Sequence, residues 1–438
     1  MDQTEALIIE TIDRHREEIL EFARDIYSHA ELGYKEFQTS EKFVKKMEQL
    51  GLRTEKGFAI TGVKSYLNED KKENASLALL GELDALRIPE HAFANPETNA
   101  AHCCGHHAQM AGVFGAALAL TVPEIAEKLD GQVVFFATPA EEYGEIEFKN
   151  QLREQGKIRY GGGKCELLRI GAFDDIDLCL THHIRPGNEI LVGSGTGNGF
   201  VSKVIRVLGK ASHAAGAPEK GVNALSAASL GLQALGLNRE TFRDEDCVRV
   251  HPIITKGGNL VNVIPDEVVV ETLVRGKTIE AFTDAAKKTD RSFKAGAVAM
   301  GAKVEISTLP GYLPTLAEEA LPELKHAAEI SASGIPVIEA SGHAGGSTDV
   351  GDVQHLMPVY TFNTGGVKGG LHQIDFEVTD EEEAYIVTAK MFALAAYGLL
   401  KEKAQRSREL VDQYEPVFKN SAEYVEFMEQ FDSKEIFE

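Results

Sequence analysis

The chain has few of the features that mark secreted or membrane proteins. It holds five cysteines in 438 residues, two of them adjacent at Cys103 and Cys104, and this pattern does not resemble a disulfide framework. No run approaches the roughly 18 consecutive apolar residues of a membrane span. The first residues, 1–5, carry acid where a secretory signal would carry basic and apolar residues. We therefore expect a soluble protein of the cytoplasm.

Positive charge is also scarce. Lys and Arg number 45 against 68 Asp and Glu, which gives a formal net charge of −23. Nucleic acids and anionic membranes bind basic surfaces, so we expect neither as a partner. The negative electrostatic field of such a chain also opposes the approach of an anionic substrate. Such a substrate would therefore need a local cation, such as an arginine, in the site.

Short apolar runs punctuate a chain that is too long for one ordinary core. Helical or glycine-rich stretches separate these runs, and this alternation predicts a largely parallel sheet with helices on both faces. We expect helices at 5–27, 39–50 and from about 380, the last opened by a capping box between Thr379 and Glu382. The predicted strands lie at 77–80, 133–137, 178–180 and 359–362.

The pattern changes between about residues 200 and 309. Strands at 201–207, 248–254, 268–274 and 303–307 and helices at 223–237 and 278–300 follow the β-α-β-β-α-β order of a ferredoxin-like unit. We therefore predict a catalytic α/β domain in two parts with an inserted α+β domain. The predicted boundaries are 1–199, 200–309 and 310–438, with glycine- and proline-rich hinges and a helical tail after residue 401.

The most informative motif is Cys104-Gly-His106, within a six-residue segment that holds three histidines and two cysteines. A thiolate and an imidazole one residue apart suit a late divalent metal. A small-residue helix is expected to follow at 108–120. A buried structural cysteine beside surface histidines is the simpler alternative, but the density of ligand types favours a metal.

Two adjacent carboxylates, Glu141 and Glu142, follow an apolar strand about 35 residues later. They could supply a metal ligand and a general base. Alternatively Thr138 is an N-cap, Pro139 the first helical residue and Glu141 part of a capping box. The two interpretations are compatible, because one glutamate can cap a helix while its neighbour faces a metal.

The remaining candidates also follow predicted strands or lie in a glycine-rich loop. Asp84 and Glu82 come after the run 77–80, at the sheet edge where ligands gather in open α/β folds. His183 and its neighbour His182 follow another strand, and solvated acids or satisfied core histidines are the alternatives. His372 lies in a glycine-dense loop, where backbone can approach a ligand closely. Their joint placement favours one two-metal site.

In order along about residues 20–400, the chain resembles the metallo-aminoacylase and carboxypeptidase superfamily. The most similar branch contains p-aminobenzoyl-glutamate hydrolase and auxin-conjugate (IAA-amino acid) hydrolases. The segments that carry the resemblance are Gly81-Glu-Leu-Asp-Ala-Leu, Cys104-Gly-His, Pro139-Ala-Glu-Glu, Gly209-Lys-Ala-Ser-His213-Ala, Asn262-Val-Ile-Pro, Gly346-Ser-Thr-Asp-Val-Gly-Asp352 and Leu371-His372.

The resemblance implies a dinuclear metal centre with an inserted dimerisation or lid domain. Glu141 would be the general base, Asp84 would orient a ligating imidazole, and Glu82 stands where the wider superfamily has a metal-binding histidine. His107 stands where relatives have Asp or Asn, and the choices of Cys104 over Cys103 and of His183 over His182 stay open. The implied ligands of two Zn²⁺ or Mn²⁺ ions are Cys104 as a bridge with His106, Glu142, His183 and His372.

Three residues of the inserted domain are associated with substrate by the same resemblance. Arg275 and Asn262 would hold the substrate carboxylate, since arginine can grip a carboxylate through two parallel hydrogen bonds. His213 would reach across a two-fold dimer interface to stabilise the oxyanion. The alternative is a solvated arginine at a strand end, a histidine that caps a turn and an asparagine that satisfies backbone.

The predicted function is metal-dependent hydrolysis of the amide bond of an N-acyl amino acid or a small dipeptide-like substrate bearing a carboxylate. A non-catalytic metal-binding scaffold is an alternative, although metal retention alone would not need Glu141. A zinc deaminase is excluded because His-x-Glu followed by Pro-Cys-x-x-Cys is absent. A cysteine protease that uses Cys104 stays open and predicts activity resistant to chelators.

Overall fold

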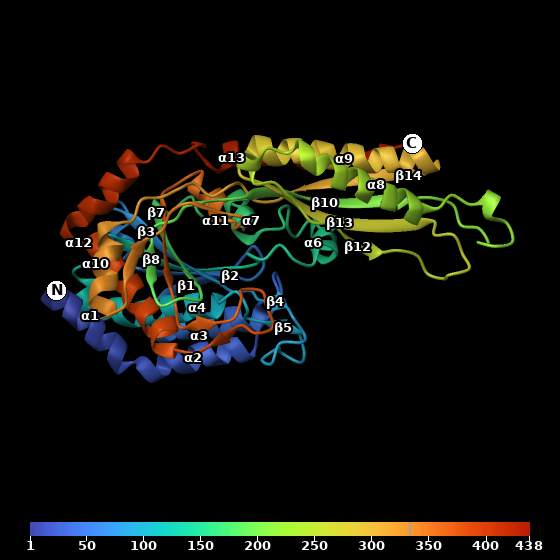
Figure 1. Ribbon diagram of the computed structural model, residues 1–438. Coiled ribbons are helices and arrows are strands. Elements are labelled where there is room, and N and C mark those ends of the chain that lie inside the picture. The colour runs from blue at the N-terminus through green and yellow to red at the C-terminus, as the bar shows by residue number, and fades with distance from the viewer. Residues whose placement is uncertain (333) are drawn as a thin grey trace. The chain divides into compact units, whose positions relative to one another are not determined.

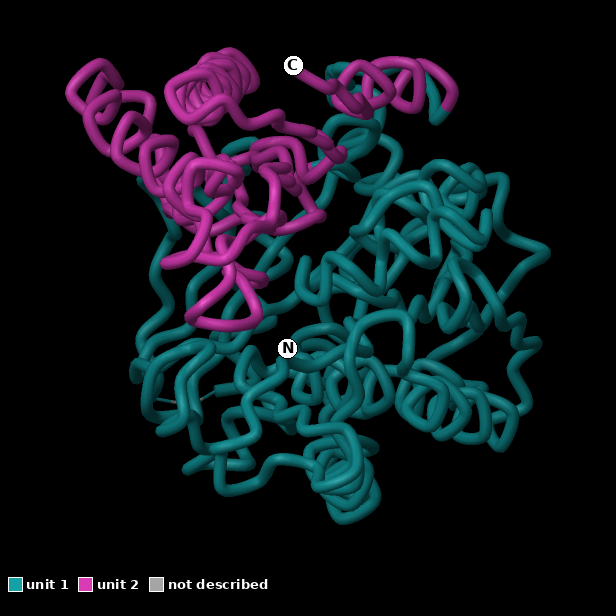
Figure 2. The backbone as a smooth tube through the Cα atoms, turned by 90° about the vertical axis from the view of Figure 1, so that its right-hand side faces the viewer, with its two compact units in different colours: residues 1–195, 316–342, 352–421 teal, residues 196–315, 343–351, 422–438 magenta. Residues whose placement is uncertain are grey.

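The computed structural model describes every residue except residue 333. Its internal contacts divide it into two units, coloured separately in Figure 2. Unit 1 comprises residues 1–195, 316–342 and 352–421, and unit 2 comprises residues 196–315, 343–351 and 422–438. The domain boundaries predicted at 200 and 309 stay a prediction. The division by contacts falls at 196 and 315 and adds two short segments to unit 2.

Unit 1 contains an eight-stranded sheet in the order β1-β2-β6-β3-β7-β17-β8-β15. The central pairs β6–β3, β3–β7 and β7–β17 are parallel, as is β8–β15, while β1–β2, β2–β6 and β17–β8 are antiparallel. The predicted mostly parallel sheet is therefore confirmed, with its antiparallel pairs toward the edges. The strands are β1 (Arg53–Phe58), β2 (Gly62–Leu67), β3 (Ser76–Glu82), β6 (Gln132–Thr138), β7 (Leu178–Ile184), β8 (Ile190–Val192), β15 (Val337–Glu339) and β17 (Val359–Thr364).

Small side chains let the buried helix α4 (His106–Leu120) pack closely. This helix contacts β3 and β7 as well as α2 (Arg16–Ser28) and α12 (Thr388–Gln413). A Cβ at Gly112 would lie 2.4 Å from a methyl carbon of Thr388, so only glycine permits this approach. On the opposite face of the sheet, the ring of Phe136 lies 5.0 Å from that of Phe173.

The N-terminal segment forms two helices rather than the single helix expected at 5–27. Helix α1 (Gln3–Arg14) ends at His15, whose φ of −95° and ψ of 14° depart from helical geometry, and α2 begins at the next residue. Helix α3 (Phe37–Gln49) is confirmed. The other helices named in this unit are α5 (Pro123–Ala126), α6 (Ile146–Glu154), α7 (Gly163–Arg169) and α10 (Pro322–Ser331).

The capping box predicted at Thr379 is wrong. Asp380 is the capping side chain, because its Oδ1 accepts from the backbone N–H of Glu382 and Glu383 at 3.0 and 3.2 Å. The Thr379 hydroxyl instead donates to the carbonyl of Gly366. The next residues, 382–387, form a π-helix that leads into α12.

The helical segment Glu382–Gln413 is the one described segment with the length and apolar character of a possible membrane span. Its most apolar window has a mean hydropathy of 1.3, and 89% of that window is buried inside the protein. Such burial is typical of a core helix.

Unit 2 contains an antiparallel sheet in the order β11-β13-β10-β14-β20, with β12 also paired to β13. Helices α8 (Ala224–Asn238) and α9 (Ile279–Met300) pack side by side against this sheet (Figure 1). The side chains of Asn223 and Thr278 cap the two helices by accepting backbone N–H groups at 3.0 and 3.1 Å. The predicted β-α-β-β-α-β order of elements is therefore present.

Two details of unit 2 differ from expectation. The strand expected at 248–254 is broken into β11 (Arg249–Val250) and β12 (Ile253–Lys256), because Pro252 cannot donate to the ladder. The predicted helical tail contains α13 (Ser421–Glu429) but ends in strand β20 (Ser433–Phe437), which covers the edge of β14 (Lys303–Pro310). The remaining strands are β10 (Gly199–Leu208) and β13 (Glu267–Gly276).

Candidate metal centre

The candidate ligands of unit 1 gather where parallel strands end. Strands β3, β6 and β7 run in register, so their carboxyl ends lie along one edge of the sheet. Asp84 follows β3, Glu142 follows β6, and His183 lies near the end of β7. Gly105, with a φ of 85°, brings the start of α4 to the same edge, since a Cβ there would lie 2.0 Å from a methyl carbon of Ile184.

Two ligand clusters share the thiol of Cys104. In each cluster the ligand atoms lie within 4.8 Å of one another. Sγ of Cys104 lies 3.3 Å from Nε2 of His183 and 3.2 Å from Nε2 of His372. Nε2 of His372 also lies 3.0 Å from Oε1 of Glu142. The first cluster is Cys104, His106 and His183, and the second is Cys104, Glu142 and His372.

The chemistry of these atoms fits a pair of late divalent cations. Nε2 of His106 and Oε1 of Glu142 are buried and have no hydrogen bond of acceptable geometry among the described residues. Thiolate, imidazole and carboxylate are the ligand types that Zn²⁺ and Mn²⁺ accept. Burial raises the pKa of the Cys104 thiol well above its usual range. A coordinated cation would hold this sulfur as a thiolate.

Strand alternation separates His183 from His182. Nε2 of His182 lies 2.8 Å from the hydroxyl oxygen of Thr364, and the His182 ring packs 4.9 Å from that of Phe362. Nδ1 of His183 lies 2.8 Å from the carbonyl oxygen of Ile184. A proton on Nδ1 leaves a lone pair on Nε2, the nitrogen that faces Cys104. The structure therefore places His183 in the cluster and His182 in the core.

Asp84 contacts one residue of each cluster. Nδ1 of His106 lies 2.8 Å from the Asp84 carbonyl oxygen and 3.3 Å from Oδ1 of the same residue. Oδ2 of Asp84 accepts the backbone N–H of Glu142 at 2.9 Å. These contacts direct Nε2 of His106 away from Asp84 and toward the cluster, as expected for a residue that orients a metal ligand.

The loop that carries Glu141 is not a helix, so its interpretation as a capping box is wrong. Residues 139–142 have no helical structure, and Ala140 has a φ of 49°. The Ala140 N–H donates at 2.8 Å to the buried carboxylate of Glu36. Burial and the nearby charge of Asp84 raise the pKa of Glu36 to about 7. Glu141 is 8% exposed, and its Oε2 lies 3.9 Å from Nε2 of His106.

The structure also reveals a buried network that the sequence did not indicate. Oε1 of Glu82 lies 2.5 Å from Nζ of Lys164, and the Gln109 amide donates to Oε2 of Glu82 at 2.7 Å. Burial is the largest single influence on Glu82 and opposes its ionisation, but the charges of Lys164 and His106 and the Lys164 hydrogen bond together lower the pKa of Glu82 to about 2. Oε2 of Glu82 lies 3.1 Å from Nε2 of His106, and with Glu141 these two residues form a third candidate cluster. The position of Gln109, one helical turn after His106, could have indicated that it lies near the site. No local sequence pattern marks Lys164 as a member of this network.

Unit 2 brings together only two of the three predicted substrate residues. The exposed His213 and Asn262 lie on neighbouring loops, joined by the Ala214 N–H to Asn262 carbonyl hydrogen bond of 2.9 Å. Arg275 pairs with Phe200 near the far end of β13. Asn262 precedes β13, so roughly 26 Å of strand separates its loop from Arg275, at ~3.3 Å per residue. One chain therefore does not bring Arg275 and Asn262 to the same carboxylate.

His213 has the geometry of the turn cap named as its alternative role. Its Nδ1 accepts the backbone N–H groups of Ala215 and Gly216 at 3.2 and 2.9 Å. The proton of the neutral ring therefore lies on Nε2, which leaves that nitrogen as a donor. Turn capping and donation from Nε2 are compatible.

Comparison with known proteins agrees with this geometry. The model of the family described as "Peptidase family M20/M25/M40" matches residues 78–397. The Xaa-Arg dipeptidase of Mus musculus is 28% identical, over 69% of this chain and 64% of the relative. The IAA-amino acid hydrolase ILR1-like 2 of Arabidopsis thaliana is 30% identical, over 60% of this chain and 56% of that relative. The matched part of the chain thus spans less than two thirds of either relative.

A solved structure shows the same fold. A Bacillus subtilis protein described as a dinuclear metal binding peptidase from the M20 family superposes with a TM-score of 0.61. It is 23% identical, and the superposition covers 89% of this chain and 99% of that protein.

Proposed function

The chain belongs to peptidase family M20/M25/M40, and on this premise we propose that it hydrolyses the amide bond of an N-acyl amino acid or a small dipeptide-like substrate. The observation that carries the proposal is the pair of clusters that share Cys104, with Glu141 beside them. The names of the mouse and Arabidopsis relatives, a dipeptidase and an IAA-amino acid hydrolase, support this substrate class.

Two divalent ions per chain are part of the proposal. Cys104 would bridge them, with His106 and His183 on one ion and Glu142 and His372 on the other. Bound there, the ions would lower the pKa of a water molecule and polarise the substrate carbonyl. The mixed donor set accepts Zn²⁺ or Mn²⁺.

Glu141 is the proposed general base. Its carboxylate is nearly buried and reaches within 3.9 Å of Nε2 of His106, so it lies beside the proposed metal ligands. It would accept a proton from that water and return it to the leaving amine. Lys149 donates at 2.6 Å to the carbonyl oxygen of Glu142 and helps to fix the loop that carries both glutamates.

We further propose a homodimer formed through unit 2. The edge strand β12 and the loop after it expose apolar side chains, and such a surface is typical of an interface. His213, exposed on the neighbouring loop, would then donate to the oxyanion in the partner's site. Arg275 and Asn262 could meet one substrate carboxylate only if they came from different chains. The exposed side chains are Ile253, Ile254, Leu260, Val261 and Val263, with exposed fractions of 53%, 42%, 65%, 105% and 37%.

The proposed setting is the cytoplasm. The five cysteines are all free thiols, four of them buried, as expected in a reducing compartment.

The experiment that tests the function is a substrate panel. Purified protein reconstituted with Zn²⁺ or Mn²⁺ is incubated with N-acyl amino acids and dipeptides, and release of the free amino acid is measured. Turnover should vanish with a chelator and return with metal. Activity that resists chelators but not thiol reagents would support a cysteine protease, and metal binding without turnover of any substrate would support a scaffold.

A further inference from the structure

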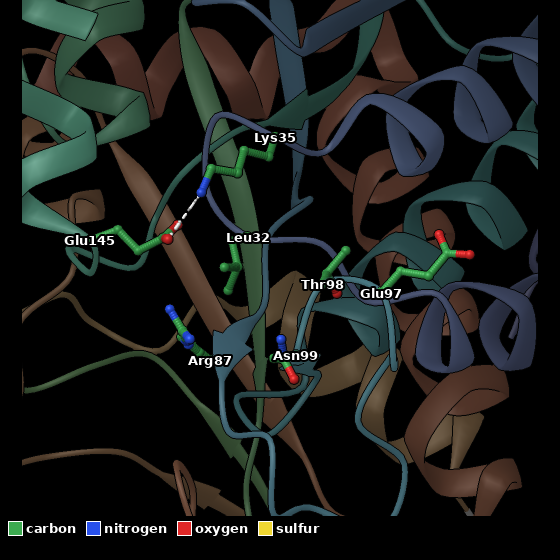
Figure 3. Close-up of a pocket in the computed structure, with 7 residues that line it drawn as sticks. All are labelled: Leu32, Lys35, Arg87, Glu97, Thr98, Asn99 and Glu145. Carbon is green, nitrogen blue, oxygen red and sulfur yellow. Dashed lines mark hydrogen bonds and ion pairs between the residues drawn. The ribbon is translucent and has the colours of Figure 1, made fainter. Parts of the chain in front are cut away.

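A cavity of about 320 Å³ opens in unit 1, and none of the cluster residues lines it (Figure 3). Two of its walls continue segments that carry site residues. Arg87 lies three residues after Asp84, and Glu145 lies three residues after Glu142. At ~3.3 Å per residue, the backbone of Arg87 lies within roughly 10 Å of that of Asp84, and the backbone of Glu145 within roughly 10 Å of that of Glu142. The lining residues are Leu32, Lys35, Arg87, Glu97, Thr98, Asn99 and Glu145.

Contacts among the lining residues leave one cation of the cavity uncompensated. Nζ of Lys35 contacts both carboxylate oxygens of Glu145, at 2.9 and 2.8 Å, and lies 4.0 Å from the centre of the Phe148 ring. In Figure 3 the carboxylate of Glu97 points away from Arg87. Across residues 1–332 and 334–438, the Arg87 guanidinium has neither an ion pair nor a hydrogen bond. Its five N–H donors are therefore available.

The backbone holds Arg87 beside a second unused polar group. Strand β4 (Leu86–Arg87) pairs antiparallel with β5 (Ala100–Ala101), with Arg87 opposite Ala100. The Ile88 N–H donates to the Asn99 carbonyl at 3.1 Å, which fixes Asn99 next to Arg87. The side-chain amide of Asn99 has no partner among the described residues. A guanidinium beside an amide is a donor set that suits a carboxylate.

Backbone and side-chain hydrogen bonds hold the rest of the cavity wall in place. Leu32 bridges to Ala85, whose N–H donates to the Glu31 carbonyl at 2.8 Å, so this wall is tied to the segment that carries Asp84. The Thr98 hydroxyl donates to the Ala30 carbonyl at 2.7 Å. Leu32 adds an apolar surface against which a short methylene chain could lie.

From these contacts we propose that the cavity binds a second carboxylate of the substrate, so that N-acyl derivatives of acidic amino acids are preferred over neutral ones. Arg87 and Asn99 are the residues that determine this specificity. The inference rests on the proposed hydrolysis and names its substrate class. In a chain of net charge −23, an unpaired arginine three residues after Asp84 supplies the local cation that a dianionic substrate requires.

The test compares N-acetylglutamate with N-acetylglutamine, which differ in one charge and hardly in size. Wild-type protein should favour the acid in kcat/KM. Arg87→Met should lower kcat/KM for the acid by about 10- to 100-fold, mainly through KM, and change that for the amide less than about 3-fold, as expected for loss of a charge-assisted pair. Arg87→Lys should recover part of the loss. Arg291→Met, at an exposed arginine of α9, is the matched control and should change neither value.

Two results would overturn the inference. One is a wild-type enzyme that treats the acid and the amide alike, and the other is an Arg87→Met variant impaired equally with both substrates. In either case hydrolysis itself would stand. If neither compound is hydrolysed, calorimetric titration of metal-loaded protein decides the matter. The acid must then bind more tightly than the amide and lose that advantage in Arg87→Met, and equal binding would refute the site independently of catalysis.

Discussion

Oδ2 of Asp84 accepts the backbone N–H of Glu142 at 2.9 Å, which ties the segment after β3 to the loop after β6. Asp84 is fully buried, and its other side-chain oxygen lies 3.3 Å from Nδ1 of His106. One carboxylate therefore orients a residue of each cluster. This arrangement makes Asp84 the structural link between the two proposed ions.

Replacing Asp84 should weaken the binding of both ions together. Asp84→Asn keeps the size of the side chain but presents an amide N–H₂ to either the Glu142 N–H or Nδ1 of His106, so one contact is lost. We expect metal affinity to fall by about 10- to 100-fold while the fold is kept. Metal titration measures the affinity, and near-ultraviolet circular dichroism checks that the fold is kept. Asp412→Asn, at an exposed site, is the control. Undiminished affinity in Asp84→Asn would show that the link is dispensable.

The adjacent residues Glu141 and Glu142 should have different roles, the first as a general base and the second as a metal ligand. Glu141→Gln should keep its metal and lose at least ~10² in turnover, because an amide cannot accept the proton. Glu142→Gln should lose metal affinity, because Oε1 of Glu142 is the carboxylate oxygen beside His372. Metal titration and turnover of both variants provide the measurement. The opposite pattern would reverse the two assignments.

Catalysis across the proposed dimer can be tested by complementation. His213→Ala and Glu141→Gln should each be inactive, because one removes the proposed oxyanion donor and the other the proposed base. Mixed subunits should form hybrid dimers in which one site has Glu141 from the first chain and His213 from the second. Activity should return toward a quarter of wild type at equal mixing. Confirmed subunit exchange without recovery of activity would exclude His213 as a residue that acts in trans.

A partly buried acid away from the clusters, Glu318, should make stability depend on pH. Burial raises the pKa of Glu318 to about 7, above its ordinary value, so the folded state holds this proton more tightly than the unfolded state. The resulting stabilisation is present below pH ~4.5 and is lost as pH rises to about 7. Glu318→Gln keeps an acceptor for the Thr361 N–H, which now donates to Glu318 at 2.7 Å.

The free energy of unfolding of Glu318→Gln, relative to wild type, should therefore improve by about 1 to 3 kcal/mol between pH 5 and pH 8. Urea unfolding at both values in the presence of a chelator gives this difference. A difference that does not change with pH would show that Glu318 titrates normally in the folded protein.

Local sequence patterns were sufficient for most elements and for the residues that the two clusters bring together. The apolar run 77–80 predicted β3 because a strand buried on both faces is continuously apolar. Cys104-Gly-His106 predicted two neighbouring side chains of ligand type, and the structure shows why glycine stands between them, because a Cβ at position 105 would clash with Ile184. His183 could be separated from His182 only once the hydrogen bonds of both rings were known.

Contacts between distant segments account for what the sequence did not reveal. Lys164 pairs with Glu82 across 82 residues, and no periodicity links the two positions. The bond from Ala140 to Glu36 holds the Glu141 loop out of a helix, although Thr138 and Pro139 form a good helix-start pattern. The separation of Asn262 from Arg275 depends on which end of β13 each loop meets, and this follows from the strand pairing rather than from either residue.

Cys104 is the proposed bridge between two ions, and the metal content of Cys104→Ala measures whether both ions depend on it. Elemental analysis of wild-type protein purified without chelator should find about two divalent ions per chain. Since both clusters contain Sγ of Cys104, Cys104→Ala should lose metal from both and lose activity with it. A Cys104→Ala protein that keeps two ions per chain would contradict the bridge and the dinuclear centre built on it.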